Sequence, residues 1–394
     1  MKNSSLAYYL VSVRKILRRN GLKVVLNPLK VYREIVNLNL HRRTLSLLGN
    51  LDYSYSDLSK NKELMAGFNQ MKHVQVHTIN WFIPNVKHVF GGVYTVLRFA
   101  DYFHSQKGIQ NRFIVYSGPL ISASDFMKKI AKSFPGLSRE EAIILRNQNV
   151  NTIPYADVSI ATIWDSAYLL LKFNNTKGKF YFIQDYEPLF YPAGSVYALA
   201  EATYRFGFYG IVNSPGVSDI ITKNYDATAE YFIPSVDRQI FYPAKRNLST
   251  PSDENPFTIF FYARPETARN AFDLGVSALR KIKSKYGKKV RIYAAGSDWH
   301  PEDYDMENTI ISLGTLPYEE TAALYRKCNL GIVFMFTKHP SYLPFELMAC
   351  GCPVLTNYNP STLWMLKDEE NCVLAEPTPT IVCEKIEILM NDPN

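Results

Sequence analysis

The chain has 394 residues, of which 47% are hydrophobic, 14% aromatic and 20% charged. Glycine and proline together make up about a tenth of the residues, which excludes collagen-like, low-complexity and largely disordered proteins. No apolar run approaches the roughly 20 residues that a membrane-spanning helix needs, so we expect no transmembrane segment. The length predicts two globular domains.

The formal net charge of +8 is concentrated at the start of the chain. Residues 1–50 hold ten Lys and Arg and one acid, Glu34, so this segment carries +9 and the other 344 residues sum to −1. The globular part is therefore close to neutral, which argues against a nucleic-acid-binding surface.

The basic N-terminal segment has an amphipathic pattern. Leu6, Leu10, Val13 and Leu17 recur at helical spacing, opposite a cluster of cations, as in helices that lie on an anionic membrane surface. A signal peptide has its basic residues before the apolar stretch, whereas here they follow it. We expect a cytoplasmic protein, peripheral on the inner face of the plasma membrane through residues 1–50. The alternative is a basic helix that packs on the rest of the protein.

All five cysteines lie in the last quarter of the chain, mostly among apolar neighbours: Cys328, Cys350, Cys352, Cys372 and Cys383. An odd number in such surroundings predicts reduced, buried thiols and a cytosolic compartment. The pair Cys350 and Cys352 resembles the start of a metal site, but no second pair follows at ligand spacing. We expect no metal.

From residue 73 the sequence alternates between β-rich runs and helix-length stretches, which predicts an open, doubly wound α/β sheet. The expected strands are 73–79, 112–116, 157–163, 179–184, 210–213 and 230–233. The polar, proline-rich stretch between 241 and 256 predicts an interdomain linker. We therefore expect a helical arm over 1–70 and Rossmann-like domains over 71–242 and 257–394.

The second domain repeats the alternation, with expected strands at 257–263, 290–295, 309–313, 330–336, 354–356 and 373–374. A helix with apolar positions from Phe272 to Ile282 follows the first of these strands. Neither domain opens with the G-x-G-x-x-G pattern of nicotinamide or flavin sites, so no cofactor is expected. The chain ends in a helical stretch, 380–390, from which we expect that a final helix of the full protein is missing.

Two arginines follow the first strand of the second domain. Parallel sheets bind ligands beyond the carboxyl ends of their strands. Arg264 and Arg269 lie there ahead of a helix, which suits a diphosphate. The alternative reading is a pair of surface salt-bridge partners.

A second group of candidate residues lies in His339-Pro340-Ser341-Tyr342-Leu343-Pro344-Phe345-Glu346. Glu346 falls near a helix start among apolar residues, where a carboxylate needs donors to offset its desolvation. A ribose diol supplies two such donors. The alternative is a carboxylate that caps its own helix.

Two further candidates lie in the first domain. Gly91 and Gly92 let backbone N–H groups approach a phosphate, although a Gly-Gly pair is also common in simple turns. The stretch Gln184-Asp185-Tyr186-Glu187 ends a strand and directs acids toward the same expected ligand, with Asp185 as a candidate for sugar or acceptor contacts.

The order of these motifs resembles the GT-B glycosyltransferases of family four, which are retaining, metal-independent and use nucleotide-sugar donors. The family's linker signature is matched by residues 234–243, from Pro234 through Asp237 and Phe241 to Pro243, without its glycine. Its diphosphate-binding Arg and Lys fall on Arg264 and Arg269, and the second Glu of its Glu-x7-Glu element falls on Glu346.

Two departures narrow the resemblance. The first Glu of Glu-x7-Glu is Lys338, and the family's usual His-Asp is Gln184-Asp185. The stretches around Asp185 and from His339 to Glu346 look like the bacterial rhamnosyltransferases that build S-layer glycan from dTDP-L-rhamnose. In that subgroup the tyrosine and the glutamate, here Tyr342 and Glu346, help to hold the nucleotide.

The resemblance implies retaining transfer of L-rhamnose from dTDP-L-rhamnose to a cell-surface polysaccharide or lipid-linked glycan. The first domain would take the acceptor and the second the donor. Gly91, Gly92, Arg264, Arg269, Ser341, Tyr342 and Glu346 would bind the donor, and Asp185, Arg264 and Arg269 would act in transfer. The alternatives are a UDP- or GDP-hexose donor, or an inactive relative that binds glycan or membrane.

Overall fold

The computed structural model describes residues 28–85, 89, 91–145, 149–244 and 251–391. The amphipathic stripe expected from Leu6 to Leu17 lies outside these residues. By their contacts, residues group into two compact units. The first holds the described chain up to Ile183, with Tyr191–Ile211 and Ile221–Glu230. The second holds Gln184–Phe190, Val212–Ile220 and the described chain from Tyr231 onward.

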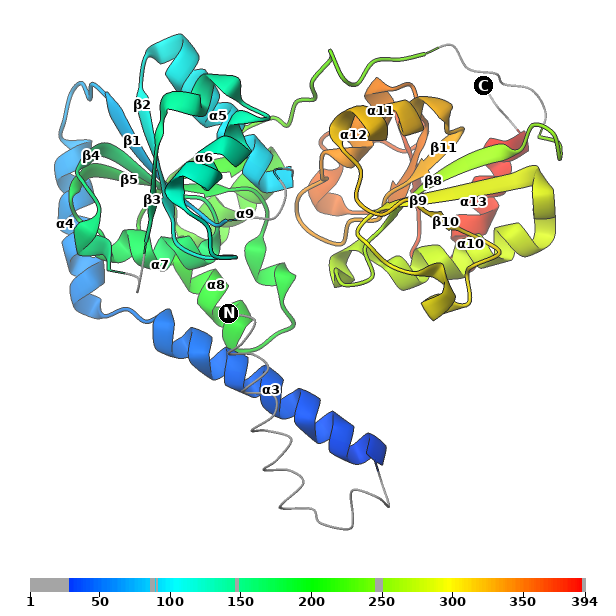
Figure 1. The fold of residues 1–394 in the computed structure, drawn as a ribbon, viewed down its shortest axis with the longest axis horizontal. Coiled ribbons are helices and arrows are strands. Elements are labelled where there is room, and N and C mark those ends of the chain that lie inside the picture. Colours follow the sequence, from blue (N-terminus) through cyan, green and yellow to red (C-terminus); the bar gives the residue numbers. More distant parts are fainter. Residues whose placement is uncertain (1–27, 86–88, 90, 146–148, 245–250, 392–394) are drawn as a thin grey trace. The chain divides into compact units, whose positions relative to one another are not determined.

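The first sheet has the strand order β3-β2-β1-β4-β5-β6-β7, and the described pairings from β3 to β5 are parallel (Figure 1). Its central strand β1 is almost wholly buried, as expected where helices cover both faces of a parallel sheet. The strands are β1 Thr78–Ile83, β2 Gln110–Val115, β3 Glu141–Ile144, β4 Ala156–Ala161, β5 Thr176–Ile183, β6 Tyr209–Asn213 and β7 Ala229–Phe232.

The helices of this part of the chain fall into two groups. α5 and α6 both contact η1, whereas α4 and α7 contact each other and pack on β5, β4 and β1. Right-handed crossovers that leave β1 in opposite directions place their helices on opposite faces. The elements are α3 Pro28–Asn50, α4 Tyr55–Asn69, α5 Gly91–Lys107, α6 Ala123–Ala131, η1 Pro135–Arg139, η2 Val150–Thr152, α7 Trp164–Lys172, η3 Glu187–Phe190, α8 Ser195–Ala202, η4 Thr203–Arg205 and α9 Pro215–Tyr225.

Helix α4, expected as part of the N-terminal arm, packs on the first sheet. Ser54 and Asp57 form a capping box at its start, and Met65 is buried. The Asn61 side chain is also buried and donates to the Phe206 carbonyl at 2.7 Å. These contacts make α4 part of the first unit rather than of a separate arm.

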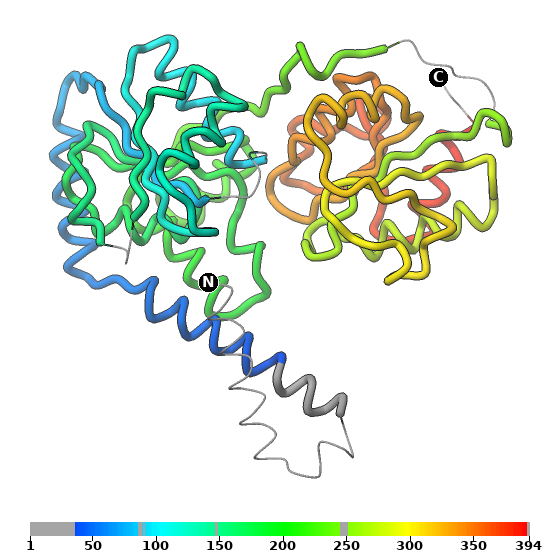
Figure 2. The backbone as a smooth tube through the Cα atoms, in the orientation of Figure 1, coloured from blue at the N-terminus to red at the C-terminus, as the bar shows by residue number. Residues whose placement is uncertain are grey.

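The second sheet is parallel throughout its described pairings, in the order β10-β9-β8-β11-β12-β13. The tube in Figure 2 passes from yellow to red as the chain runs from β9 to its last helix within this unit. The elements are β8 Phe257–Ala263, η5 Ala268–Asn270, α10 Phe272–Tyr286, η6 Gly287–Lys289, β9 Val290–Gly296, η7 Pro301–Tyr304, β10 Ile311–Ser312, α11 Tyr318–Lys327, β11 Leu330–Ile332, α12 Leu343–Ala349, β12 Val354–Asn357, η8 Pro360–Thr362, β13 Val373–Ala375 and α13 Pro379–Asn391.

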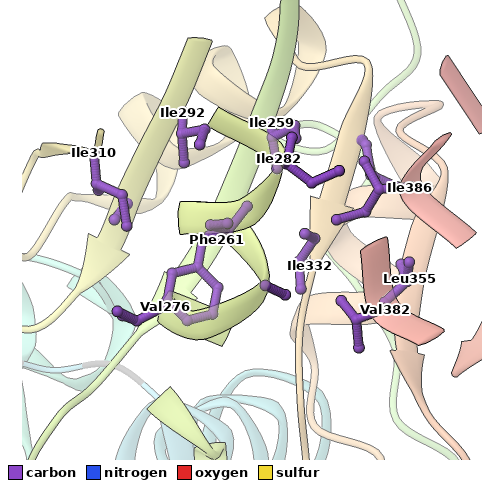
Figure 3. Close-up of a cluster of buried hydrophobic side chains, with 14 of the residues drawn as sticks. Ile259, Phe261, Val276, Ile282, Ile292, Ile310, Ile332, Leu355, Val382 and Ile386 are labelled. Atoms are coloured by element: carbon purple, nitrogen blue, oxygen red, sulfur yellow. The ribbon is translucent and has the colours of Figure 1, made fainter. Parts of the chain in front are cut away.

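Two apolar cores cover the faces of the second sheet. Alternate residues of β8 point to opposite faces: Phe261 packs with α10 and α13, and Phe260 packs with α11 and α12. Figure 3 shows the first of these cores, in which Phe261 and Val276 meet. The expected pair of doubly wound α/β sheets is confirmed.

The linker signature has a structural role within the second unit. The Asp237 side chain accepts from the Gln239 N–H at 2.9 Å, and its carbonyl accepts from the Phe241 N–H at 2.8 Å. This turn directs the buried Phe241 ring onto Tyr318 and Tyr325.

Strand positions differ from the prediction where burial is highest. The polar–apolar alternation of 73–79 suggested a strand, but β1 begins at Thr78 and runs through the continuous apolar stretch to Ile83. The short edge strand β3 was missed, because four residues, one exposed and three partly buried, give little periodicity. Strand β11 ends at Ile332 rather than at 336. Helix α13 was expected almost as observed.

All five cysteines are buried and free, as predicted. Within the described ranges, none of the helices has both the length and the hydropathy needed to cross a bilayer. A search of the same ranges for three clustered His, Cys, Asp or Glu side chains that suit a metal ion found no group.

A close approach of α10 to β8 depends on Gly275. A Cβ atom there would lie 2.2 Å from Cζ of the buried Phe261 ring. We expect Gly275→Ala to lower the free energy of unfolding by about 1–3 kcal/mol. The matched change Gly67→Ala in α4 meets no atom within 4 Å and should stabilise by about 0.5–1 kcal/mol. Urea unfolding of both variants tests this, and equal stability of the two would contradict it.

Candidate functional site

The second sheet has a topological switch point between β8 and β11. Strand order runs from β8 to β9 and β10 on one side, and from β11 to β12 and β13 on the other. Ligands of such sheets bind outside the carboxyl ends of the strands at this point. Residues 264–271 follow β8 and residues 333–342 follow β11, so these two loops define the candidate site.

The loop after β11 is buried but irregular, and side-chain amides replace its strand partners. Asn357 Oδ1 accepts from the Met335 N–H at 2.7 Å, and Asn357 Nδ2 donates to the Met335 carbonyl at 3.1 Å. Asn359 Nδ2 donates to the Thr337 carbonyl at 2.5 Å. Buried peptide groups need such partners, and these bonds explain why β11 ends early.

Arg269 links the two loops. Its carbonyl accepts from the Phe336 N–H at 2.8 Å, and its guanidinium lies over the Phe190 ring, 4.2 Å from the centroid. The positive charge of Arg269 also acts on Asp185. An aromatic ring and a carboxylate thus hold a guanidinium at the switch point, where an anionic ligand is expected.

Asp185 binds the second loop. Its carboxylate is buried and accepts from the Tyr186 N–H at 2.7 Å, from the Thr337 hydroxyl and from the Lys338 N–H. Burial raises the Asp185 pKa to about 6, against these donors and the charge of Arg269. With its lone pairs engaged by the chain, Asp185 braces residues 337–338.

The His339–Tyr342 stretch forms a tight turn before α12. Ser341 adopts φ = +66°, a region unusual for a residue with a side chain. Its N–H donates to His339 Nδ1 at 3.0 Å. Desolvation lowers the His339 pKa to about 3, so the ring is neutral. The Tyr342 hydroxyl accepts from Asn213 Nδ2 at 3.2 Å.

Glu346 lies in the first turn of α12 and is 5% exposed. Burial raises its pKa to about 8. The start of α12 has no side-chain cap hydrogen bond, so the alternative in which Glu346 caps its own helix is not observed. Across the described chain no hydrogen bond to this carboxylate is found, and a buried acid without donors is costly unless a ligand supplies them.

Arg264 contacts a different set of side chains from Arg269. Its guanidinium lies 3.4 Å from the Tyr262 hydroxyl and 3.4 Å from a Glu266 oxygen. Glu266 in turn accepts from the Ser297 hydroxyl, which follows β9. Arg264 therefore forms a salt bridge with Glu266, as in the alternative interpretation of the sequence. Of the two arginines, only Arg269 contacts the loop after β11.

Gly91 and Gly92 begin helix α5 in the first unit. Gly91 has φ = +57°, and a Cβ at this position would meet no atom within 4 Å. The open space around Gly91 leaves its surface accessible to a ligand.

Sequence reasoning missed Phe190 and Asn213. Phe190 gave no signal, because its role depends on the Arg269 guanidinium from a distant part of the chain. Asn213 ends β6. Because ligands of parallel sheets bind beyond the carboxyl ends of the strands, this position was a signal that the sequence offered.

Solved structures of other proteins have a similar fold. HepE from Anabaena, in complex with UDP and glucose, is similar with a TM-score of 0.60 at 14% identity, over 80% of this chain and 90% of that chain. Sucrose-phosphate synthase from Thermosynechococcus elongatus has a TM-score of 0.58 at 14% identity over the same shares. The protein has the two-domain, Rossmann-like GT-B fold of glycosyltransferases.

Comparison of the sequence with protein-family models is more specific than comparison of folds. Residues 76–212 match the WsaF N-terminal domain and residues 257–387 match the WsaF C-terminal domain. Because the two domains occur in order and together cover more than half of the chain, the chain belongs to the WsaF family.

A curated relative supports this family relationship. The O-antigen biosynthesis protein RfbC of Myxococcus xanthus is 42% identical over 312 residues, which is 79% of this chain and 24% of RfbC. The chain thus spans about a quarter of the length of that relative.

The buried Glu346 predicts a pH dependence of stability. An acid whose folded pKa is raised binds a proton more tightly in the folded state, so its contribution is complete below the unfolded pKa and is lost as pH rises toward about 8. Glu346→Gln should remove a slope of up to about 1.4 kcal/mol per pH unit. Burial lowers the pKa of Lys179 to about 7. Above that pH the contribution of Lys179 to the free energy of unfolding rises with pH, which is opposite to the contribution of Glu346.

The measurement is therefore the difference in unfolding free energy between Glu346→Gln and the unmutated protein from pH 5 to 8.5. The advantage of the variant should grow with pH over this interval. A difference that is constant with pH would show that Glu346 titrates normally.

Proposed function

We propose that this protein transfers L-rhamnose from dTDP-L-rhamnose to a growing cell-surface polysaccharide or lipid-linked glycan, with retention of anomeric configuration. The proposal rests on two features that occur together in the second unit. The Arg269 guanidinium is braced at the switch point, and the buried Glu346 carboxylate lacks hydrogen-bond donors. A nucleoside diphosphate supplies an anion for the first and a ribose diol for the second.

The choice of donor rests on the motifs of the chain. The stretch from His339 to Glu346 resembles S-layer rhamnosyltransferases, and both WsaF domains match this chain. The Tyr342 hydroxyl, positioned by Asn213, and Glu346 would hold the nucleotide. The name of the Myxococcus relative supports a polysaccharide as the product.

In the proposed transfer, the bond between sugar C1 and the diphosphate oxygen breaks and a bond from the acceptor oxygen to C1 forms on the same face. A phosphate oxygen of the departing dTDP takes the acceptor proton, so no protein base and no metal are required. Arg269, with Arg264, would stabilise the charge that develops on the diphosphate.

We further propose that the enzyme is cytoplasmic and binds the inner membrane surface through residues 1–50. Ten cations against one acid would be attracted to anionic lipid at about 1 kcal/mol each near the surface. Lipid-linked glycan would then be assembled where its acceptor is held.

Isothermal titration with dTDP and with UDP tests the nucleotide assignment. We expect dTDP to bind more tightly than UDP, and Arg269→Ala to weaken dTDP binding by about 10- to 100-fold, because a charge-assisted contact is lost. The matched control is Arg326→Ala, since Arg326 also stacks on an aromatic ring, Tyr242 at 4.3 Å, and bonds the Ile240 carbonyl. This control should retain dTDP affinity. Tighter binding of UDP would reject the dTDP assignment.

The bracing role of Asp185 predicts a pH profile. Because its pKa is about 6, protonation below that pH removes an acceptor of the Thr337 and Lys338 donors. We expect kcat/KM for transfer to fall below about pH 6, and Asp185→Asn to lower kcat while flattening that limb. An unchanged acid limb in the variant would exclude this role.

The proposed reaction also predicts the product and its conditions. Turnover of dTDP-L-rhamnose should continue unchanged in EDTA, since no step uses a metal. NMR of the glycan product should show the donor's anomeric configuration, and an inverted product would contradict the proposed same-face transfer.

A further inference from the structure

Seven polar side-chain atoms of the second unit are fully buried and have no hydrogen-bond partner among the described residues, and four of them belong to residues in or near the loop after β11. Two come from the ends of β5 and β6, one from the residue before α9 and one from the loop after β11. They are Gln184 Oε1, Asn213 Oδ1, Ser214 Oγ and His339 Nε2.

Several contacts connect the residues of this cluster to one loop. Gln184 precedes Asp185, whose carboxylate accepts from Thr337 and Lys338. Asn213 bonds the Tyr342 hydroxyl, and the Tyr342 and His339 ring centroids are 6.0 Å apart. His339 thus belongs to residues 337–342, Asn213 bonds this loop, and Gln184 adjoins a residue that bonds it.

Close packing extends to the residues that follow Asn213. A Cβ on Gly216 would lie 2.2 Å from the Ser361 carbonyl oxygen and 3.6 Å from that of Lys338. The start of α9 is thus fixed against the same loop, and Ser214 next to it has φ = +97°. The hydroxyl of Ser214 is held in place without a bond to the chain.

Burial without partners is unfavourable for each of these atoms. Elsewhere in the same unit the buried amides of Asn357 and Asn359 are paired with backbone groups. Three other buried atoms of this unit also lack partners, namely Asn270 Oδ1, Trp299 Nε1 and Trp364 Nε1. The four atoms of the cluster differ from these in belonging to residues in or near one loop, where an external group with hydroxyls, or water, would satisfy them together.

The chemistry of the cluster selects a neutral polyol. Gln184 Oε1 and Asn213 Oδ1 only accept hydrogen bonds, while the Ser214 hydroxyl both donates and accepts. His339 is neutral with its Nδ1 accepting from the Ser341 N–H, so Nε2 carries the proton and donates. None of the four atoms is charged, which suits sugar hydroxyls better than a phosphate or carboxylate.

We propose that Gln184, Asn213, Ser214 and His339 form a hydroxyl-binding subsite that recognises the transferred sugar and sets which sugar the enzyme accepts. This inference rests on the proposed glycosyl transfer and adds to it the residues that read the sugar, separate from Arg269, which faces the anion.

The test compares nucleotide with nucleotide sugar. Affinities are measured for dTDP and dTDP-L-rhamnose, UDP and UDP-glucose, and GDP and GDP-mannose, and the sugar increment is the affinity ratio within each pair. Ser214→Ala removes only the unpartnered hydroxyl. We expect it to leave nucleotide affinity unchanged, to reduce the sugar increment of the preferred pair about 5- to 30-fold, and to leave Tm unchanged or higher.

Two further variants complete the design. Gln184→Met removes the amide at similar volume and should also reduce the sugar increment with nucleotide affinity retained. The control is Ser159→Ala in β4, because the buried Ser159 hydroxyl donates to Thr176 Oγ1 at 3.1 Å. This control should lower Tm and leave the sugar increment unchanged.

Each outcome decides one of the two proposals. Preference for the UDP or GDP pair, with the increment still lost in Ser214→Ala, rejects dTDP-rhamnose and supports the subsite. An increment that is unchanged in both Ser214→Ala and Gln184→Met, or absent from every pair in the unmutated protein, overturns the subsite. A lower Tm with an unchanged increment in Ser214→Ala shows that the hydroxyl is held by an ordered water only, which also overturns it.

Discussion

The buried loop after β11 must satisfy its peptide groups without a strand partner, and the candidate site depends on how it does so. Asn357 and Asn359 provide side-chain amides for Met335 and Thr337, so the chain can leave the sheet at Ile332 and remain buried. Asp185 also bonds this loop, so residues from distant parts of the chain determine its position. The irregular course of this loop is thus a paired, rigid arrangement that presents the turn at 339–342.

Charge is divided within the site in a way that suits a nucleotide sugar. Arg269 is braced by the Phe190 ring and faces the switch point, Glu346 is buried without donors, and the cluster around Ser214 is uncharged. In the proposed function these three environments would bind a diphosphate, a diol on a ribose and the hydroxyls of a sugar. Buried polar groups without partners cost stability, and such costs are expected where binding rather than folding has shaped the residues.

Much of the fold was predictable because hydrophobic patterning is local. The run at 257–263 and the apolar spacing from Phe272 to Ile282 identified β8 and α10 directly. The errors have tertiary causes: β1 is buried on both faces and so lacks alternation, and β11 is cut short by amides that lie more than 20 residues away. Of the candidate residues, Arg269 and Asp185 are joined through the same loop, whereas Arg264 pairs with Glu266. Their spacing of five residues could not reveal this, because a short 3-10 helix turns the backbone between them.

By itself the sequence determined two α/β sheets, a basic N-terminal segment and the strand ends at which polar residues gather, since each of these follows from periodicity, charge or position relative to a strand. Only the tertiary structure decided which of those polar groups are satisfied. Asp185 has its donors, while Glu346 and the Ser214 hydroxyl lack theirs, and hydrogen bonding between residues far apart in sequence depends on packing that no local pattern records.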